Sequence, residues 1–485
     1  MRALVLVAFL LSIQLLMAQQ VVMSEPEKLS SKTPNASILG KSNEGIIVYK
    51  YGRGTDIIEA YNSNMGVRWK KTLNIQQENS SILKMVLYPA KTVVFFLSEN
   101  KNYSVVYAQA LSSKFDGDGK FVVVDTIEGN KIDLENDLSV VHSQNRSQLL
   151  VYYPVSNNGA LQYLQAVGMS ENLEVSYRGR INLPADVAAY QLSGVVPDNQ
   201  GNLSILLERK ERFRKSETNK EFRVFYYRPE TGLLSEIDFK LQRPIFGSIG
   251  LEVDNVNRRI VLTGLYSNDG EKDARGYFFE AYSPFASPEE AYTSYYQHFP
   301  GDLIFQVTGK DTSTYDKGLF SFRIKDIILR QDGGAIFITE SQFDNTENIE
   351  MPSFGPASGP SIRTVKVHYY NDILVVSVKP SGEMDWYSIM KKKQVSEDDE
   401  GFYSSFSIVN TNDMLRFIYN DEIYYKANVN QYSMDSKGQS VRSLLFNSGE
   451  KELLLVPSIA KQISANELII PSFRKNSLRF VKISF

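Results

Sequence analysis

GIIVYKY, which spans Gly45–Tyr51, is the first copy of a pattern that recurs along the chain and decides the predicted fold. Each copy is a strand of about six apolar, aromatic or β-branched residues that follows a turn rich in Asn, Asp and Gly. The later copies are TVVFFLS (Thr92–Ser98), QLLVYYP (Gln148–Pro154), NLSILLE (Asn202–Glu208), RIVLTGL (Arg259–Leu265), GAIFITE (Gly334–Glu340), MLRFIYN (Met414–Asn420) and ELIIPSF (Glu467–Phe473). Most copies lie roughly 50 residues apart, a period typical of a β-propeller with four-stranded blades.

A hairpin of two strands with a Gly in its turn follows several of these copies. The segments Ile57–Trp69, Phe222–Ile237 and Ile373–Trp386 have this form, and Gly supplies the positive φ that a tight hairpin needs. The eight copies predict an all-β propeller of eight blades with four antiparallel strands each. Seven blades is the alternative, and two stacked β-sandwiches are the second architecture. The apolar segment Val21–Met23 and the end strand Ser477–Phe485 are candidates to share one blade, since sharing removes an exposed edge.

A short helical insertion is predicted near residues 287–299. Ser287 fits an N-cap, Pro288 the first helical position and Glu289 an acidic first turn, and Pro300 ends the segment. Long segments between strands are predicted as loop insertions, at residues 208–221, 267–276, 283–318 and 341–364. We assign all of them to loops between second and third strands or to connections between blades, which places them on one face. Long loops on a rigid scaffold are where binding function concentrates.

The first 18 residues have the features of a signal peptide, with an N-terminal membrane anchor as the alternative. Arg2 precedes an apolar run, and the small residue Ala18 precedes the expected cleavage point. We expect residues 19–485 to form a single propeller domain with no transmembrane segment. The chain has no cysteine, which excludes disulfides, thiolate metal sites and a lipoprotein anchor. We therefore expect an exported monomer, either periplasmic or extracellular.

Charge and motifs argue against several classes of function. Lys and Arg total 53 and Asp and Glu total 56, a formal net charge of −3. Because nucleic-acid binding needs a basic footprint, we expect no nucleic-acid partner. The three histidines, His142, His298 and His368, are far apart in the sequence, and no P-loop, nucleophile elbow or dinucleotide-binding glycine motif is present. We expect no metal and no cofactor.

Two groups of side chains in the predicted loops are candidates for ligand binding. Arg212 and Arg214 belong to a basic run that suits an anionic ligand such as an acidic glycan. The second group is aromatic, and rings with polar tips suit sugars or peptides. Its members are Tyr295, Tyr296, His298, Phe343 and Tyr403. The alternatives are a solvated hairpin for the basic run and packing of the insertions onto the blades for the rings.

Three further segments are KDIILRQDGGAIFITE (Lys325–Glu340), YYNDILVVSVKPSGEMDWYSIMKKKQ (Tyr369–Gln394) and DDEGFYSSF (Asp398–Phe406). They resemble an uncharacterised family of exported bacterial proteins with β-propeller-like repeats. The resemblance implies export and a β fold, and it brings no catalytic residue. We expect a non-enzymatic binding or scaffold protein of the bacterial envelope or exterior, whose long-loop face engages a glycan or an envelope protein. A carbohydrate-active hydrolase or lyase with its site on the same face is the alternative.

Overall fold

The computed structural model describes residues 19–485 apart from 30–34, 53–55, 77–79, 118, 130–136, 211–220, 240, 242–244, 269–270, 272, 312–316, 352–360, 424–427, 448 and 450–451. The described chain separates into two compact units. The central unit contains Asn74–Gln342 and Asp372–Ile389. The terminal unit contains the described residues up to Leu73, together with Phe343–Asn371 and Met390–Phe485.

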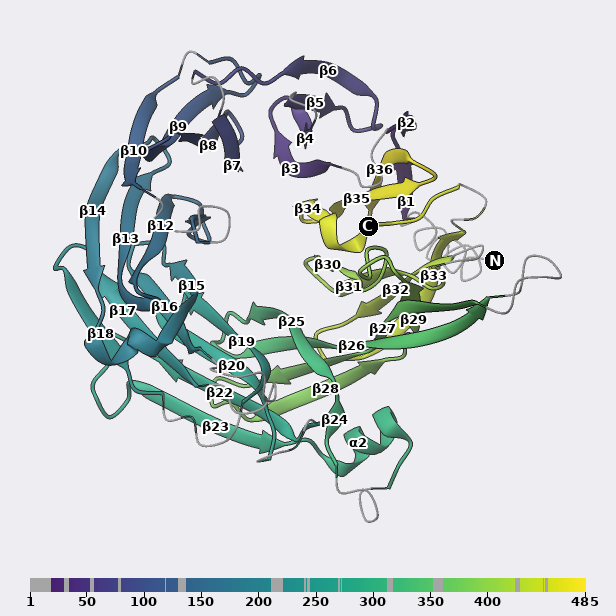
Figure 1. Cartoon of the computed structure of the whole chain (residues 1–485). Coiled ribbons are helices and arrows are strands. Elements are labelled where there is room, and N and C mark those ends of the chain that lie inside the picture. Colours follow the sequence, from purple (N-terminus) through teal and green to yellow (C-terminus); the bar gives the residue numbers. More distant parts are fainter. Residues whose placement is uncertain are drawn as a thin grey trace, which may run out of the picture. The chain divides into compact units, whose positions relative to one another are not determined.

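Four-stranded antiparallel sheets follow one another along the central unit, each with its strands side by side in chain order (Figure 1). The strands are β7 (Ser80–Leu87), β8 (Lys91–Glu99), β9 (Tyr103–Ser112) and β10 (Phe121–Glu128); β11 (Ser139–His142), β12 (Gln148–Asn157), β13 (Ala160–Ser170) and β14 (Val175–Asn182); β15 (Tyr190–Pro197), β16 (Leu203–Arg209), β17 (Phe222–Arg228) and β18 (Leu233–Ile237); and β19 (Ile245–Asp254), β20 (Arg259–Tyr266), β22 (Gly276–Tyr282) and β23 (Tyr292–His298). This strand order is that of propeller blades.

A further sheet contributes to both units, and short elements lie between the strands. Its strands are β25 (Phe322–Leu329), β26 (Ala335–Met351), β27 (Ser361–Val378) and β28 (Met384–Met390), with β29 (Gln394–Glu397) beside β27. The short elements are η1 (Ala185–Ala189), β21 (Asp273–Ala274), α2 (Gly301–Thr308) and β24 (Leu319–Phe320), and β21 pairs with β24. Among the described residues, no helix is long and apolar enough to cross a bilayer.

The terminal unit holds sheets of the same kind. Their strands are β3 (Ala36–Ser42), β4 (Gly45–Lys50), β5 (Ile57–Tyr61) and β6 (Val67–Thr72); β30 (Ser407–Asn410), β31 (Leu415–Asn420), β32 (Asn428–Met434) and β33 (Ser440–Asn447); and β34 (Lys461–Ser464), β35 (Glu467–Arg474), β36 (Ser477–Ser484) and β1 (Gln20–Met23), with β2 (Glu27–Lys28) beside β36 and η2 (Pro457–Ile459) before β34. Every predicted copy of the repeat is the second strand of its sheet, so this part of the prediction is confirmed.

The pairing of the two chain ends is also confirmed. β1 runs antiparallel to β36, with Val21 opposite Ile483 and Met23 opposite Val481. The N-terminal strand is therefore the fourth strand of a sheet whose other strands come from the C-terminal end. Because β36 has a partner on both sides, its hydrogen-bonding groups are not exposed at an edge.

Successive sheets of the central unit pack through their apolar faces. Phe95 and Val151 meet in one such core, Phe225 packs with Leu150 in the next, and Phe279 with Phe337 in another. The first strands β7, β11, β15, β19 and β25 are neighbours in that order. In Figure 1 the fourth strands β10, β14, β18 and β23 lie on the outer side of this unit.

The predicted helix at residues 287–299 is wrong. Residues 292–298 form β23, which pairs with β22 through, for example, Tyr282 opposite Tyr292. The helix of this region is α2, which starts after Pro300 and ends at Gly309, whose φ is 71°. Pro300 therefore begins a helix instead of ending one. Tyr and Thr favour strands, and the cross-strand partner outweighs the capping signal at Ser287.

The predicted loop insertions are partly strand. Residues 341–351 and 361–364 belong to the paired strands β26 and β27, and the Thr364 hydroxyl donates to Asn348 Oδ1 at 2.9 Å. The segment 283–318 holds β23 and α2. The other two segments, 208–221 and 267–276, lie between second and third strands, and most of 208–221 lies outside the described residues.

Candidate functional site

A cavity of about 280 Å³ opens between the β7–β10 sheet and the β11–β14 sheet of the central unit. Its polar lining consists of Asp125, Thr126 and Glu128 from β10, Tyr153 from β12, Tyr163 and Gln165 from β13, and Arg180 from β14. We call it the Tyr153 cavity. Its size is slightly below that of typical ligand pockets, which are roughly 300–1,000 Å³, so it suits one small ring.

The strand register explains why these side chains meet. Tyr153 is opposite Gln165, and Gln165 is opposite Arg180. Directly opposite residues project from the same face of a sheet, and so do residues two apart on one strand, such as Tyr163 and Gln165. The sheet therefore presents a row of polar side chains towards β10 of the neighbouring sheet.

Two contacts fix the geometry of the cavity. The Tyr153 hydroxyl donates a hydrogen bond of 3.0 Å to Asp125 Oδ2. The Arg180 guanidinium lies 4.8 Å from the centroid of the Tyr163 ring, a cation–π contact. Burial, and then the nearby Asp125 charge, raise the pKa of Tyr153 above its usual value. The hydroxyl therefore stays protonated at neutral pH and acts as a hydrogen-bond donor.

The cavity lies at the end of the central unit where second strands lead into third strands. Val155, which also lines the cavity, is near the end of β12, and Tyr163 is near the start of β13. The turn between these strands is joined to the next loop, because Lys210 Nζ donates to the Gly159 carbonyl at 2.7 Å. The described beginning of the basic run therefore lies at this end. Arg209 is paired with Glu221.

The predicted ligand-binding residues belong to different parts of the chain: some to each of the two units, and two to the residues that are not described. Arg212 and Arg214 lie outside the described residues. Tyr295, Tyr296 and His298 lie on β23 in the central unit. Their role in ligand binding stays a prediction.

The rings on β23 pack against neighbouring strands and turns. Tyr296 stacks on Phe278 with ring centroids 5.7 Å apart, and His298 meets the Tyr266 ring edge-on at 5.6 Å. A Cβ at Gly382 would lie 2.4 Å from Tyr295 Cβ, so Tyr295 lies against the hairpin that follows β27. These contacts agree with the alternative that the rings serve packing.

The remaining two aromatic candidates belong to the terminal unit. Phe343 stacks on Tyr369 with ring centroids 4.7 Å apart and an interplanar angle of 10°. Tyr403 meets Phe402 edge-on at 4.9 Å, and its carbonyl accepts a hydrogen bond from Asn420 Nδ2. Phe343 therefore braces the paired strands β26 and β27.

Sequence reasoning missed the residues of the Tyr153 cavity. Tyr153 stands inside a copy of the strand repeat, where it reads as a core residue. Gln165 and Arg180 alternate with apolar residues in ALQYLQAV and SYRGRIN, and this polar alternation on two adjoining strands is the signal that could have found them.

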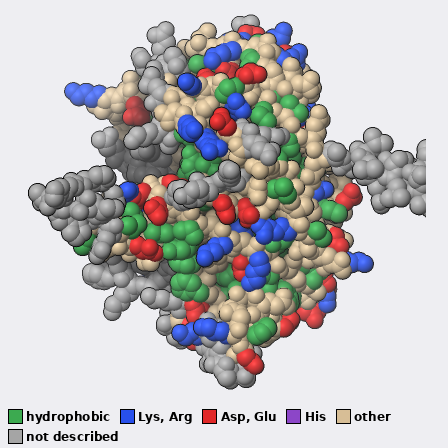
Figure 2. Space-filling model, turned by 90° about the vertical axis from the view of Figure 1, so that its right-hand side faces the viewer, with side chains coloured by type: hydrophobic (Ala, Val, Ile, Leu, Met, Phe, Trp, Pro, Cys, Tyr) green, Lys and Arg blue, Asp and Glu red, His purple; other side chains and the backbone are tan. Residues whose placement is uncertain are grey.

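Charges of both signs are mixed on the described surface. Figure 2 shows Lys and Arg side chains beside Asp and Glu side chains over one face of the molecule. Ion pairs of the described residues include Arg363–Asp398 at 2.6 Å and Lys366–Glu400 at 3.0 Å. Such exposed pairs each add little stability.

No protein-family model and no curated protein sequence matches the chain. Among solved structures, the polysaccharide lyase Uly1 is similar with a TM-score of 0.40 and 10% identity, over 96% of this chain and 99% of that one. The WD40 domain of SCAP from fission yeast has a TM-score of 0.37 and 7% identity, over 96% and 98%. The uncharacterized protein lmo1340 from Listeria monocytogenes EGD-e has a TM-score of 0.37 and 8% identity, over 93% and 94%. At such low identities and TM-scores, we take no functional argument from these likenesses.

Proposed function

We propose that this chain is a non-enzymatic binding protein that holds one ring of a saccharide in the Tyr153 cavity. The observation that carries this proposal is the lining of the cavity, where a buried hydroxyl, an amide, a guanidinium and two carboxylates converge on about 280 Å³. A sugar ring presents hydroxyl groups that both donate and accept. It also has an apolar face that packs on aromatic rings such as Tyr163.

The scaffold of the proposal is an eight-bladed propeller formed by residues 19–485. Sheets with the strand order of propeller blades support it, and so does the fourth strand that β1 adds to the C-terminal sheet. We further propose that the protein is exported, as the sequence of residues 1–18 and the resemblance to the exported bacterial family suggest. An experimental structure with seven blades would refute the scaffold.

A carbohydrate-active hydrolase is the second candidate, and one observation favours it. Glu252 on β19 and Asp326 on the neighbouring β25 have raised pKa values. Burial, and then the Asp326 charge, raise the pKa of Glu252 to about 7. Glycoside cleavage uses two carboxyl groups, one of which is protonated near neutral pH. Neither residue lines the Tyr153 cavity, so the two candidates predict different sites.

The test is a glycan array followed by calorimetry on residues 19–485. We expect one glycan class to bind, and we expect Tyr163→Ala and Gln165→Ala each to weaken binding about tenfold or more, a change of about 1.4 kcal/mol. Tyr292→Ala is the matched control, because Tyr292 is an exposed ring of the same unit outside the cavity. Binding by no glycan, or binding that survives both cavity variants, would refute the proposal. Cleavage products that disappear in Glu252→Gln would establish the hydrolase instead.

A further inference from the structure

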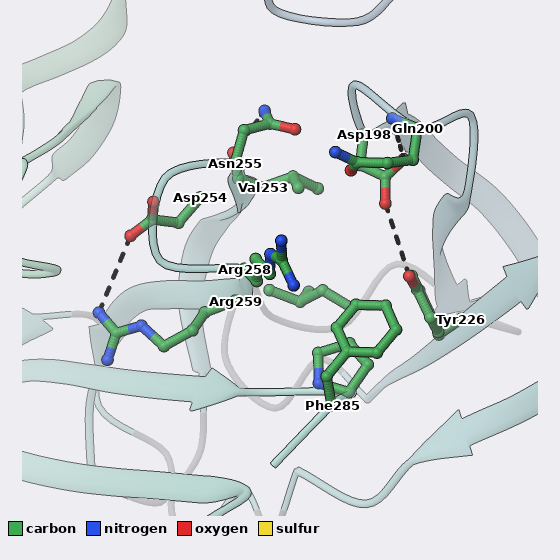
Figure 3. Close-up of a pocket in the computed structure, with 11 residues that line it drawn as sticks. Asp198, Gln200, Tyr226, Val253, Asp254, Asn255, Arg258, Arg259 and Phe285 are labelled. Atoms are coloured by element: carbon green, nitrogen blue, oxygen red, sulfur yellow. Dashed lines mark hydrogen bonds and ion pairs between the residues drawn. The ribbon is translucent and has the colours of Figure 1, made fainter.

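A second cavity lies at the opposite end of the central unit, where first strands turn into second strands. It lies between the turn at Asp198–Asn202 and the turn at Asp254–Arg259 (Figure 3). Its volume is about 20 Å³, room for roughly one water molecule. We call it the Arg258 notch.

The two aspartates of the notch are already occupied by their own turns. Asp198 Oδ1 accepts the backbone N–H groups of Gln200 at 2.9 Å and Asn202 at 2.8 Å. Asp254 Oδ1 likewise accepts the N–H groups of Val256 and Asn257. These carboxylates fix the turns and are not free to bind a cation.

Hydrogen bonds between successive turns hold the notch rigid. The Asn145 N–H donates to Asn199 Oδ1 at 3.1 Å, and the Asn199 N–H donates to Asn255 Oδ1 at 2.8 Å. Asn257 Nδ2 then donates to the Gln331 carbonyl at 3.2 Å. The side chains on these turns therefore stand on a preorganised frame.

Arg258 is the exception in this satisfied network. Its φ is 54°, in the left-handed region, as at Arg146 in the corresponding turn between β11 and β12. The side chain is exposed and forms no ion pair with the described residues, whereas its neighbour Arg259 lies 4.0 Å from Asp254 and donates to the Gly333 carbonyl. Figure 3 shows the Arg258 side chain between the two turns and close to the Phe285 ring.

Phe285 lines the notch together with Arg258. Phe285 is 61% exposed and Val256 is 73% exposed, and both come from turns of the β19–β23 sheet. Large apolar side chains left in water beside a charged group are typical of binding surfaces.

We propose that the Arg258 notch binds a carboxylate carried on an aromatic or apolar body. The guanidinium takes the carboxylate through two parallel hydrogen bonds, and the Phe285 ring covers the apolar part. A phosphate dianion fits less well, because Asp198 and Asp254 line the same notch as Arg258. The carboxylate comes either from a small aromatic acid or from the C-terminus of a peptide.

Calorimetry with paired probes tests this proposal on residues 19–485. The probes are N-acetylphenylalanine, its amide, and a pentapeptide that ends in phenylalanine with either a free or an amidated C-terminus. We expect the free acid forms to bind at least tenfold more tightly than the amides, and Arg258→Gln to remove this difference. Binding of the small acid identifies a free ligand, and binding confined to the acid peptide identifies a peptide partner.

Two further variants separate binding from folding. Arg178→Gln removes another exposed arginine of the same unit and is expected to leave binding unchanged. Arg258→Gly relieves the left-handed backbone while deleting the guanidinium, so we expect a melting temperature at or above that of the wild type together with lost binding. Equal binding of acids and amides, no binding of any probe, or wild-type affinity in Arg258→Gln would overturn the proposal.

Discussion

We predict that Glu280→Gln removes a loss of stability that the wild-type protein suffers when the pH is raised. Glu280 lies on β22 and is 1% exposed. Its Oε1 accepts a hydrogen bond of 2.6 Å from the Ser294 hydroxyl on β23. Burial raises the pKa of this carboxyl from 4.5 to about 7, and the hydrogen bond from Ser294 offsets only part of that effect.

Linkage between proton binding and folding gives the sign and the size. Between pH 4.5 and about 7 the folded state holds a proton at Glu280 that the unfolded state has released, so the free energy of unfolding falls as the pH rises. This contribution is fully present below pH 4.5 and is lost above about 7. A pKa change of this size corresponds to about 3 kcal/mol. Glutamine does not ionise, so the variant lacks the dependence.

The assay is urea unfolding at about pH 5 and about pH 8, followed by tryptophan fluorescence and circular dichroism. Glu252, whose pKa is also raised to about 7, is present in both proteins, so the difference between them isolates Glu280. Glu383→Gln is the control, because Glu383 is exposed and paired with Lys379. The reasoning is refuted if wild type and Glu280→Gln lose the same free energy of unfolding over this range.

Deleting residues 19–23 exposes the edge of β36. We therefore expect the variant to self-associate, as seen by size-exclusion chromatography, and to unfold at a lower urea concentration. A monomer with an unchanged urea midpoint would contradict this. In Gly276→Ala the new Cβ would lie 2.0 Å from the Gln297 carbonyl oxygen, and we expect about 1–3 kcal/mol lower stability in urea. Gly179→Ala, which meets nothing within 4 Å, should change little, and equal losses in both would count against the clash. Tyr153→Phe removes the hydrogen bond to Asp125. We expect the free energy of unfolding to fall by about 1 kcal/mol and glycan binding to weaken. Unchanged affinity would show that the ligand does not depend on this hydroxyl.

The strands of the repeat could be predicted because their signal is local. Copies such as Thr92–Ser98 and Gln148–Pro154 are continuous apolar runs next to turn residues, and such runs favour buried strands wherever they occur. The pairing of β1 with β36 could be predicted because both ends of the chain are apolar and each needs a partner. The first prediction rests on local sequence alone, and the second on the rule that an exposed strand edge needs a partner.

The helix and the sites could not be predicted because they depend on neighbours in the folded structure. Tyr292–His298 becomes a strand because β22 offers it a free edge, and nothing in the segment itself states that. The Tyr153 cavity needs β10, which belongs to a different sheet from Tyr153. Arg258 lines a cavity only because the turn at Asp198 lies opposite it.

Glu59 and Glu280 show this dependence in a form that can be tested. Both stand before Ala-Tyr on the third strand of a sheet, in IIEAY and FFEAY. Burial opposes the ionisation of Glu59 too, but hydrogen bonds from Lys50, Tyr61 and Lys70 outweigh it and hold its pKa below the usual value. The cross-strand partner of Glu59 is Lys70, whose Nζ is 2.9 Å from Glu59 Oε1.

The matching partner of Glu280 is Ser294, which carries no charge and is exposed on the fourth strand. We therefore expect Ser294→Lys to supply the missing cation and to lower the pKa of Glu280. The fall in stability between about pH 5 and about pH 8 should then shrink by up to about 3 kcal/mol, measured in the same urea series. Ser294→Lys combined with Glu280→Gln is the control, since the lysine then has no carboxylate to pair with. An unchanged pH dependence in Ser294→Lys would mean that the fourth-strand neighbour does not set the charge of the third-strand glutamate.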